Sequence, residues 1–222
     1  MKKVWSKILT FLKFLRDDVI KFPAYILAHP LKGFEEMKRY GKGKISVSIT
    51  LIIIAIVLNI MSIQYSAIIV NDVKISEIDS VSEIFYILGA VSVVTVANWS
   101  VTTLFDGKGN MKNIFMMVTY CLYPYIWSSL IAMIFSNIIT TDELAIYALI
   151  RGLGTFMTGY MFFFGIISIH EYGLGQCLLT ILFTVVAILI IIFAGILVFD
   201  LGQKIYAFFY QLYQEITLRG LL

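Results

Sequence analysis

The chain has 222 residues, of which 60% are hydrophobic and 14% are charged, and its formal net charge is +3. An average soluble domain is about 45–50% apolar and about 25% charged, so the composition excludes an ordinary soluble domain. The mean hydropathy of +0.91 and several apolar runs near the roughly 20 residues that cross a bilayer predict an all-α integral membrane protein.

Residues 1–44 are predicted to form amphipathic helices at the cytoplasmic interface. Residues 1–22 have the pattern of one helix, with tryptophan and phenylalanine on its apolar face and lysines on the other. This pattern favours binding to anionic lipids of the inner leaflet; packing of the helix on the protein is the alternative. A second short helix is expected to begin at His29-Pro30, because proline is tolerated in a first helical turn.

Five apolar segments follow and define a membrane domain over residues 45–199. Only helices and closed barrels satisfy every backbone hydrogen bond in lipid, and these runs lack the alternation of barrel strands. We therefore expect a bundle of five transmembrane helices. Their expected bounds are 45–70, 81–105, 113–139, 144–169 and 176–199.

Three helix starts carry capping signals. Ser80 with Glu83, and Thr140 with Glu143, each have the spacing of a capping box, in which a hydroxyl and a carboxylate satisfy early backbone N–H groups. Asn110 is expected to cap the third span in a similar way.

Residues 200–222 are predicted to form a C-terminal amphipathic helix at the extracytoplasmic interface. Apolar residues recur on one face of this segment, and glutamines and charged residues lie away from it. The helix continues from the fifth span and is expected to bend at Gly202. Its apolar stripe consists of Leu201, Ile205, Phe208, Leu212 and Ile216.

The distribution of basic residues predicts the orientation. Residues 1–44 hold 11 of the 17 Lys and Arg residues, and the loop after the second span adds Lys108 and Lys112, which leaves four for the opposite side. Loops rich in Lys and Arg stay cytoplasmic. We therefore expect a multi-pass protein of the cell membrane with a cytoplasmic N-terminus and an extracytoplasmic C-terminus.

The end of the second span carries candidate motif residues. Asp106-Gly107 is a strong turn pair, because glycine accepts positive φ and aspartate bonds its own backbone. Trp99 is expected at the membrane interface, where tryptophan is favoured. Asn98 lies deeper, so its amide needs a partner; a hydrogen bond to another helix is favoured over a role in transport.

The third and fourth spans carry features with two interpretations each. Pro124 is expected to kink the third span, which either shapes packing or opens a cavity for a substrate. A stripe of small residues on the fourth span would let two helices approach closely; the partner helix belongs to this chain or to a second copy in a homo-oligomer. Arg151, near the outer end of this span, is expected to extend to the interface. The stripe consists of Ala148, Gly152, Thr155 and Gly159.

His29 and His170 both belong near the cytoplasmic surface, with Glu171 beside the second. They would indicate a metal site only if a third ligand converged on them, and none is evident. The sequence also lacks a nucleophile paired with a base, a phosphate-binding glycine loop and a nucleic-acid-binding module. We therefore expect no metal, no cofactor, no nucleic-acid partner and no enzymatic activity.

Four motifs occur in order along the chain. They are His29-Pro30 followed by Gly33-Phe34; Asn98-Trp99 followed by Leu104-Phe105-Asp106-Gly107-Lys108-Gly109; Tyr123-Pro124; and Ile169-His170-Glu171-Tyr172. Over about residues 28–200 this set resembles the bacterial branch of the Yip family, the Ypt- and Rab-interacting membrane proteins. The resemblance implies five spans and a cytoplasmic N-terminus. Eukaryotic members of the family act in vesicle trafficking and contact Rab-type GTPases, and their acidic DLYGP-like stretch is missing from this sequence. Some bacterial members are associated with sugar-transport systems.

These observations lead us to expect a non-enzymatic Yip-type protein that binds or scaffolds partners in the membrane, as an accessory to a transport system. The alternative is a transporter or channel for a small molecule, ion or lipid, with a cavity near Asn98 and Pro124. The expected partners are the bilayer, anionic inner-leaflet lipids and another membrane protein such as a transporter subunit.

Overall fold

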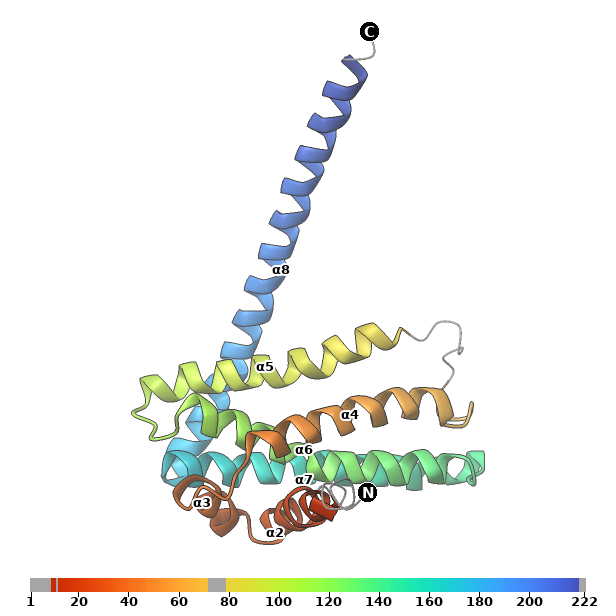
Figure 1. Cartoon of the computed structure of the whole chain (residues 1–222). Coiled ribbons are helices and arrows are strands. Elements are labelled where there is room, and N and C mark those ends of the chain that lie inside the picture. Colours follow the sequence, from red (N-terminus) through yellow and green to blue (C-terminus); the bar gives the residue numbers. More distant parts are fainter. Residues whose placement is uncertain (1–8, 11, 72–78, 220–222) are drawn as a thin grey trace.

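The computed structural model describes residues 9–10, 12–71 and 79–219, and within these residues it contains helices and no strand. Four long helices lie side by side and the last helix leaves them (Figure 1). Five helices are long and apolar enough to cross a membrane, so the predicted all-α, five-span fold is confirmed. The helices are η1 (Phe14–Lys21), α2 (Phe22–Ala28), α3 (Pro30–Arg39), α4 (Ile45–Tyr65), α5 (Ser80–Leu104), α6 (Met111–Ser136), η3 (Thr141–Glu143), α7 (Leu144–His170) and α8 (Leu174–Arg219).

Two of the three predicted helix caps are present. Asn110 accepts a hydrogen bond from the backbone N–H of Asn113 at 2.9 Å, and Thr140 and Glu143 form the reciprocal capping box. The box predicted at Ser80 is wrong, because Asp79 caps α5 by accepting from the Val81 N–H at 3.0 Å. Aspartate is an equally good cap one residue earlier, and this choice frees the Glu83 carboxylate for a contact with α4.

Helix α6 forms the centre of the bundle. Within its most apolar window 67% of the residues are buried, against 22–28% in α4, α5 and α7. Tyr120 and Met117 of α6 are fully buried, as is Phe34 of α3, and Met37 of α3 is 1% exposed. The short helix predicted after His29-Pro30 is therefore present and packs its apolar face against the bundle.

The described part of the N-terminal helix also packs on the bundle. The Tyr123 hydroxyl of α6 donates to the Ile20 carbonyl at 3.2 Å, and Lys44 pairs with Asp18 at 2.6 Å. Val19 is 4% exposed and packs on the protein, whereas Leu12 is 54% exposed, so binding of this helix to anionic lipids stays a prediction. Residues 1–8 and 11 of the predicted helix lie outside the described residues.

This N-terminal segment also runs further than predicted, through α2 to Ala28, and widens into the π-helix η1 just before Pro23. Proline lacks an N–H and its ring clashes with the carbonyl four residues earlier. A π-turn has wider spacing and so accommodates the proline without ending the helical path.

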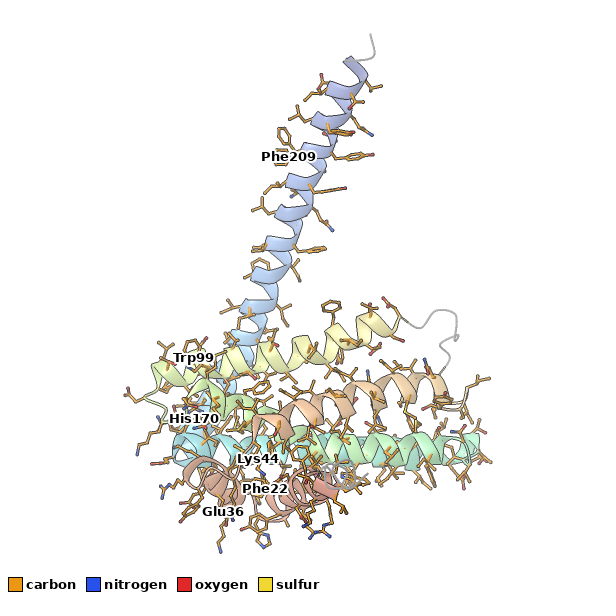
Figure 2. All side chains as sticks on the ribbon, viewed as in Figure 1. Phe22, Glu36, Lys44, Trp99, His170 and Phe209 are labelled. Carbon is orange, nitrogen blue, oxygen red and sulfur yellow. The ribbon has the colours of Figure 1, made fainter. Side chains whose placement is uncertain are left out.

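Helix α8 is longer than the predicted fifth span and lacks the predicted bend. It is one continuous helix through Gly202, so the bend expected there is wrong; a single glycine weakens a helix by about 1 kcal/mol but does not break it. From Ile192 to Leu218 every residue is exposed, and Phe209 stands far from the other helices (Figure 2).

The small-residue contact on α7 is made by a different glycine from those predicted. Ala148, Gly152, Thr155 and Gly159 are all exposed, and nothing lies within 4 Å of a Cβ built on either glycine. Gly154 is buried instead, and a Cβ there would clash with the Ser128 side chain of α6. The intramolecular interpretation of the stripe is therefore wrong, and a contact with a second copy stays a prediction.

Candidate functional site

The second and fourth sequence motifs meet at one end of the bundle, where the α5–α6 loop covers the end of α7. We call this place the motif junction and define it by Phe105–Gly109 of the loop and His170–Tyr172 after α7; Figure 2 marks its position at His170. The N–H of Gly107 donates to the Thr102 carbonyl at 2.8 Å and closes the turn.

The turn uses its aspartate and glycine differently from the prediction. Asp106, at φ 53°, adopts the left-handed conformation, which aspartate tolerates better than most residues. Gly107 is required for space, because a Cβ there would lie 2.5 Å from His170 Nδ1 and 2.7 Å from the Tyr172 hydroxyl oxygen. Gly109 is similarly close, with its Cβ position 2.6 Å from Ile169 Cγ2. The two glycines therefore let the loop backbone rest directly on the end of α7.

His170 is the buried centre of the junction, with an exposed fraction of 1%. Its ring stacks on Tyr172 at 5.2 Å between centroids, and its Nδ1 accepts from the Gly109 N–H at 3.4 Å. Its Nε2 has no hydrogen-bond partner among the described residues.

Tyr172 ties the junction to α5. Its hydroxyl donates to the Phe105 carbonyl at 3.1 Å. Burial, together with the nearby charge of Asp106, raises the pKa of Tyr172. The phenol therefore keeps its proton at neutral pH and remains a donor.

Glu171 forms ion pairs with three basic side chains, which come from α3 and from the α5–α6 loop. Its carboxylate pairs with Lys108 of the loop at 2.7 Å, with Lys38 of α3 at 3.1 Å and with Arg39 at 3.5 Å. The hydrogen bond from Lys108, followed by that from Lys38, lowers the pKa of Glu171 to about 2. The carboxylate is thus ionised at neutral pH and joins α3, the loop and α7 electrostatically.

Asn98 makes a contact between α5 and α8. Its side chain is fully buried, and Nδ2 donates to the Thr184 hydroxyl at 3.2 Å. The inter-helix hydrogen bond predicted for Asn98 is therefore present, although Oδ1 has no partner among the described residues. The neighbouring Trp99 is 42% exposed on the outside of the bundle.

His29 and Pro30 act outside the junction. The exposed His29 ring stacks on Tyr25 at 5.3 Å, and its carbonyl accepts from the Gly33 N–H in the first turn of α3. The motif thus starts the helix that carries Lys38 to Glu171. In the described part of the chain no three His, Cys, Asp or Glu side chains are arranged to hold a metal ion.

Among the described residues, the cavity beside Pro124 does not extend to Asn98. Helix α6 runs through Pro124 as one helix, and the proline borders a cavity of about 340 Å³ between α6 and α7 that Leu27 of α2 also lines. The lining is apolar except for Ser128, and Asn98 is not part of it. This arrangement lacks the common polar cavity that the transport alternative requires.

Two contact residues at this end were not identified from the sequence. Thr184 lies four residues after Thr180 on α8, and both are buried; hydroxyl residues one turn apart in an otherwise apolar run indicate a polar contact between helices. Lys38 lies within a run of basic residues, so no local pattern distinguishes it from its solvent-exposed neighbours.

Five helices long and apolar enough to cross a membrane define an α-helical integral membrane protein. The chain belongs to the Yip1 domain family, because the Yip1 domain matches residues 24–196. The match runs from α2 into α8 and includes all four motifs. Searches of curated proteins and of solved structures find no match to this chain.

Proposed function

We propose that this Yip1-domain protein is a non-enzymatic member of the bacterial branch that binds another membrane protein through the distal half of α8, defined here as residues 200–219. In this proposal it serves as an accessory to a transport system in the cell membrane. Its N-terminus and motif junction are cytoplasmic and its C-terminus is extracytoplasmic.

The observation that carries the proposal is the length and exposure of α8. At about 1.5 Å per residue, its 46 residues extend about 69 Å, more than twice the roughly 30 Å hydrocarbon core. One crossing therefore covers only part of the helix. Large apolar side chains continue beyond that part, including Phe208 at 60%, Phe209 at 61% and Tyr213 at 67% exposure.

Aromatic residues concentrated on an exposed helix favour protein binding. Tyr and Phe are enriched where protein interfaces bury their central residues, and an apolar helix face is a common docking element. The hydrogen bond between Asn98 and Thr184 complements this role, because it fixes the first part of α8 on α5 while the distal half stays exposed.

The charge distribution supports the proposed orientation. Lys38, Arg39 and Lys108 gather at the motif junction, and basic residues of short loops stay cytoplasmic. A reporter fused after Leu222 is expected to behave as extracytoplasmic, and a cytoplasmic signal would contradict the orientation.

Site-specific photocrosslinking in native membranes tests the partner proposal. A photoreactive residue at Phe209 is expected to give one reproducible protein adduct, identified by mass spectrometry as a membrane protein other than this chain. The matched control is Leu149, which is 62% exposed on α7 and is expected to give lipid adducts. Lipid adducts alone at both positions would contradict the proposal.

A further inference from the structure

Four spanning helices each contribute one polar side chain to a connected chain of contacts. The Tyr125 hydroxyl of α6 donates to Asn59 Oδ1 of α4 at 3.2 Å, and Asn59 Nδ2 donates to Glu83 Oε2 of α5 at 2.6 Å. The guanidinium carbon of Arg151, on α7, lies 5.2 Å from the centre of the Tyr125 ring. We call these four residues the polar belt.

Arg151 does not simply extend outward as predicted. One of its terminal nitrogens donates to the Ser129 hydroxyl of α6 at 2.5 Å, so the side chain lies against the neighbouring helix. Arg151 forms no ion pair with any residue in the described ranges. Glu83 is the carboxylate of the belt, but its bond to Asn59 keeps it at the far end of the chain of contacts. A guanidinium has five N–H donors, so most of those of Arg151 remain for a ligand.

An apolar cavity of about 210 Å³ lies directly beside the belt. On each of the four helices, the residues that line the cavity lie on the side of the belt residue that is nearer to the motif junction. These are earlier residues on α4 and α6, which run away from the junction, and later residues on α5 and α7, which run toward it. The lining residues are Ala55, Tyr86, Ile87, Ala90, Val91, Leu122, Tyr125, Thr155 and Thr158. The two threonine hydroxyls donate to carbonyls of their own helix, which leaves the cavity without a free hydroxyl donor from α7.

An arginine side chain close to an apolar cavity matches the chemistry of a phospholipid, which has an anionic phosphate and apolar acyl chains. We propose that Arg151 binds the phosphate of a membrane phospholipid whose acyl chain enters the cavity between α4, α5, α6 and α7. Arginine pairs with phosphate through two parallel hydrogen bonds, and a charged residue within a spanning segment requires a partner. An apolar cavity supplies the matching surface for a hydrocarbon chain.

The position of the belt along the spans agrees with this ligand. Arg151 lies seven residues after the start of α7 at Leu144, about 10 Å along the helix axis. The spanning segment that contains it has 30 residues, or about 45 Å, which exceeds the roughly 30 Å hydrocarbon core by a few residues at each end. Arg151 lies ten residues after Thr141, the start of this segment, and therefore about 8 Å inside the edge of the hydrocarbon core in the leaflet opposite the motif junction. A guanidinium at that depth requires a polar or anionic partner, and a lipid phosphate drawn toward it supplies one.

The test compares three probes on the purified full-length chain by native mass spectrometry. The probes are a phospholipid, a diacylglycerol with the same acyl chains, and inorganic phosphate. The wild-type chain is expected to retain the phospholipid alone, and Arg151→Gln is expected to weaken retention by about tenfold or more, because hydrogen bonds to a charged group are lost. Lys204→Gln is the control, since Lys204 is an exposed cation of α8 paired only within its own helix.

A second variant keeps the charge and removes the cavity. Ala90→Phe fills the lining beside α5 and is expected to lower phospholipid retention while Arg151 remains. Equal retention of diacylglycerol and phospholipid would overturn the role of the phosphate. Displacement of the lipid by inorganic phosphate would overturn the role of the acyl chain, and unchanged retention in both Arg151→Gln and Ala90→Phe would place the lipid elsewhere.

Discussion

The motif junction and the distal half of α8 differ in what surrounds their side chains. At the junction, loop glycines rest on His170, and Glu171 is surrounded by cations from two other elements. Along the distal half of α8 the described side chains have no neighbour from the rest of the bundle and are exposed. The difference indicates that the family motifs hold one end of the bundle together, whereas the free surface of the last helix is available for binding.

The largest effect is expected from crowding the junction. Gly107→Val places side-chain atoms where a Cβ alone already meets His170 and Tyr172, and such overpacking lowers the free energy of unfolding by about 1–3 kcal/mol. Unfolding in detergent, followed by circular dichroism, measures the change. Gly202→Ala is the control on α8, where nothing lies within 4 Å; it is expected to cause no loss. Equal stability of the two variants would mean that the junction is not tightly packed.

Acid is expected to weaken the junction through Glu171. The folded-state pKa of about 2 lies below the ordinary value of 4.5, so the stability that this carboxylate contributes is present above about pH 4.5 and is lost as pH falls toward 2. Thermal unfolding between about pH 6 and about pH 3 measures this slope. Glu171→Gln removes its share of the slope and Lys108→Gln reduces it; identical slopes in all three chains would contradict the assignment.

A smaller loss of stability is expected at the contact between α5 and α8. Thr184→Val removes the acceptor of the Asn98 amide and should cost about 0.6 kcal/mol, the average for such bonds in membranes, and at most about 1.7 kcal/mol. A double-mutant cycle with Asn98→Ala isolates the pair. Thr217→Val is the matched control, because its hydroxyl bonds only to the Tyr213 carbonyl of its own helix. A coupling energy of zero would show that α8 is held by its other contacts.

The smallest effect is expected on the outer face of α7. Gly152→Ala and Gly159→Ala meet nothing within 4 Å, and alanine is the better helix former, so the free energy of unfolding should not fall. Gly154→Ala, which meets Ser128, should lower it. If light scattering also shows a lower molar mass for Gly152→Ala and Gly159→Ala than for the wild-type chain, the stripe packs on a second copy. A loss of stability in these two variants equal to that of Gly154→Ala would contradict the packing of α7.

Local patterns predicted local structure well. The spans were found from apolar length alone, and Asn110 and Thr140 were identified as caps because capping requires only residues close in sequence. The error at Ser80 is also local, since Asp79 competes for the same N–H groups. The bend at Gly202 was wrong because glycine permits a change of direction without requiring one.

The tertiary contacts were beyond the sequence patterns. Two faces of α7 carry small residues, and only the position of Ser128 decides that Gly154 is the buried one. The motifs include the residues that form the junction, but no pattern predicted that the second and fourth motifs meet. Nor did one predict the cations that surround Glu171, because Lys38 reaches it across 133 residues of sequence. The polar belt was also missed, since it joins single residues from four helices that have no common local pattern.

A distance between α5 and the distal half of α8 tests the central claim most directly. Spin labels at Tyr86 and Phe209, both exposed, are compared by pulsed electron paramagnetic resonance with labels at Tyr86 and Trp99, which are about 20 Å apart along α5. Because α8 leaves the bundle (Figure 1), the Tyr86–Phe209 distance is expected to be clearly the longer of the two. A Tyr86–Phe209 distance equal to or below the α5 reference would mean that α8 folds back along the bundle, and would contradict the account.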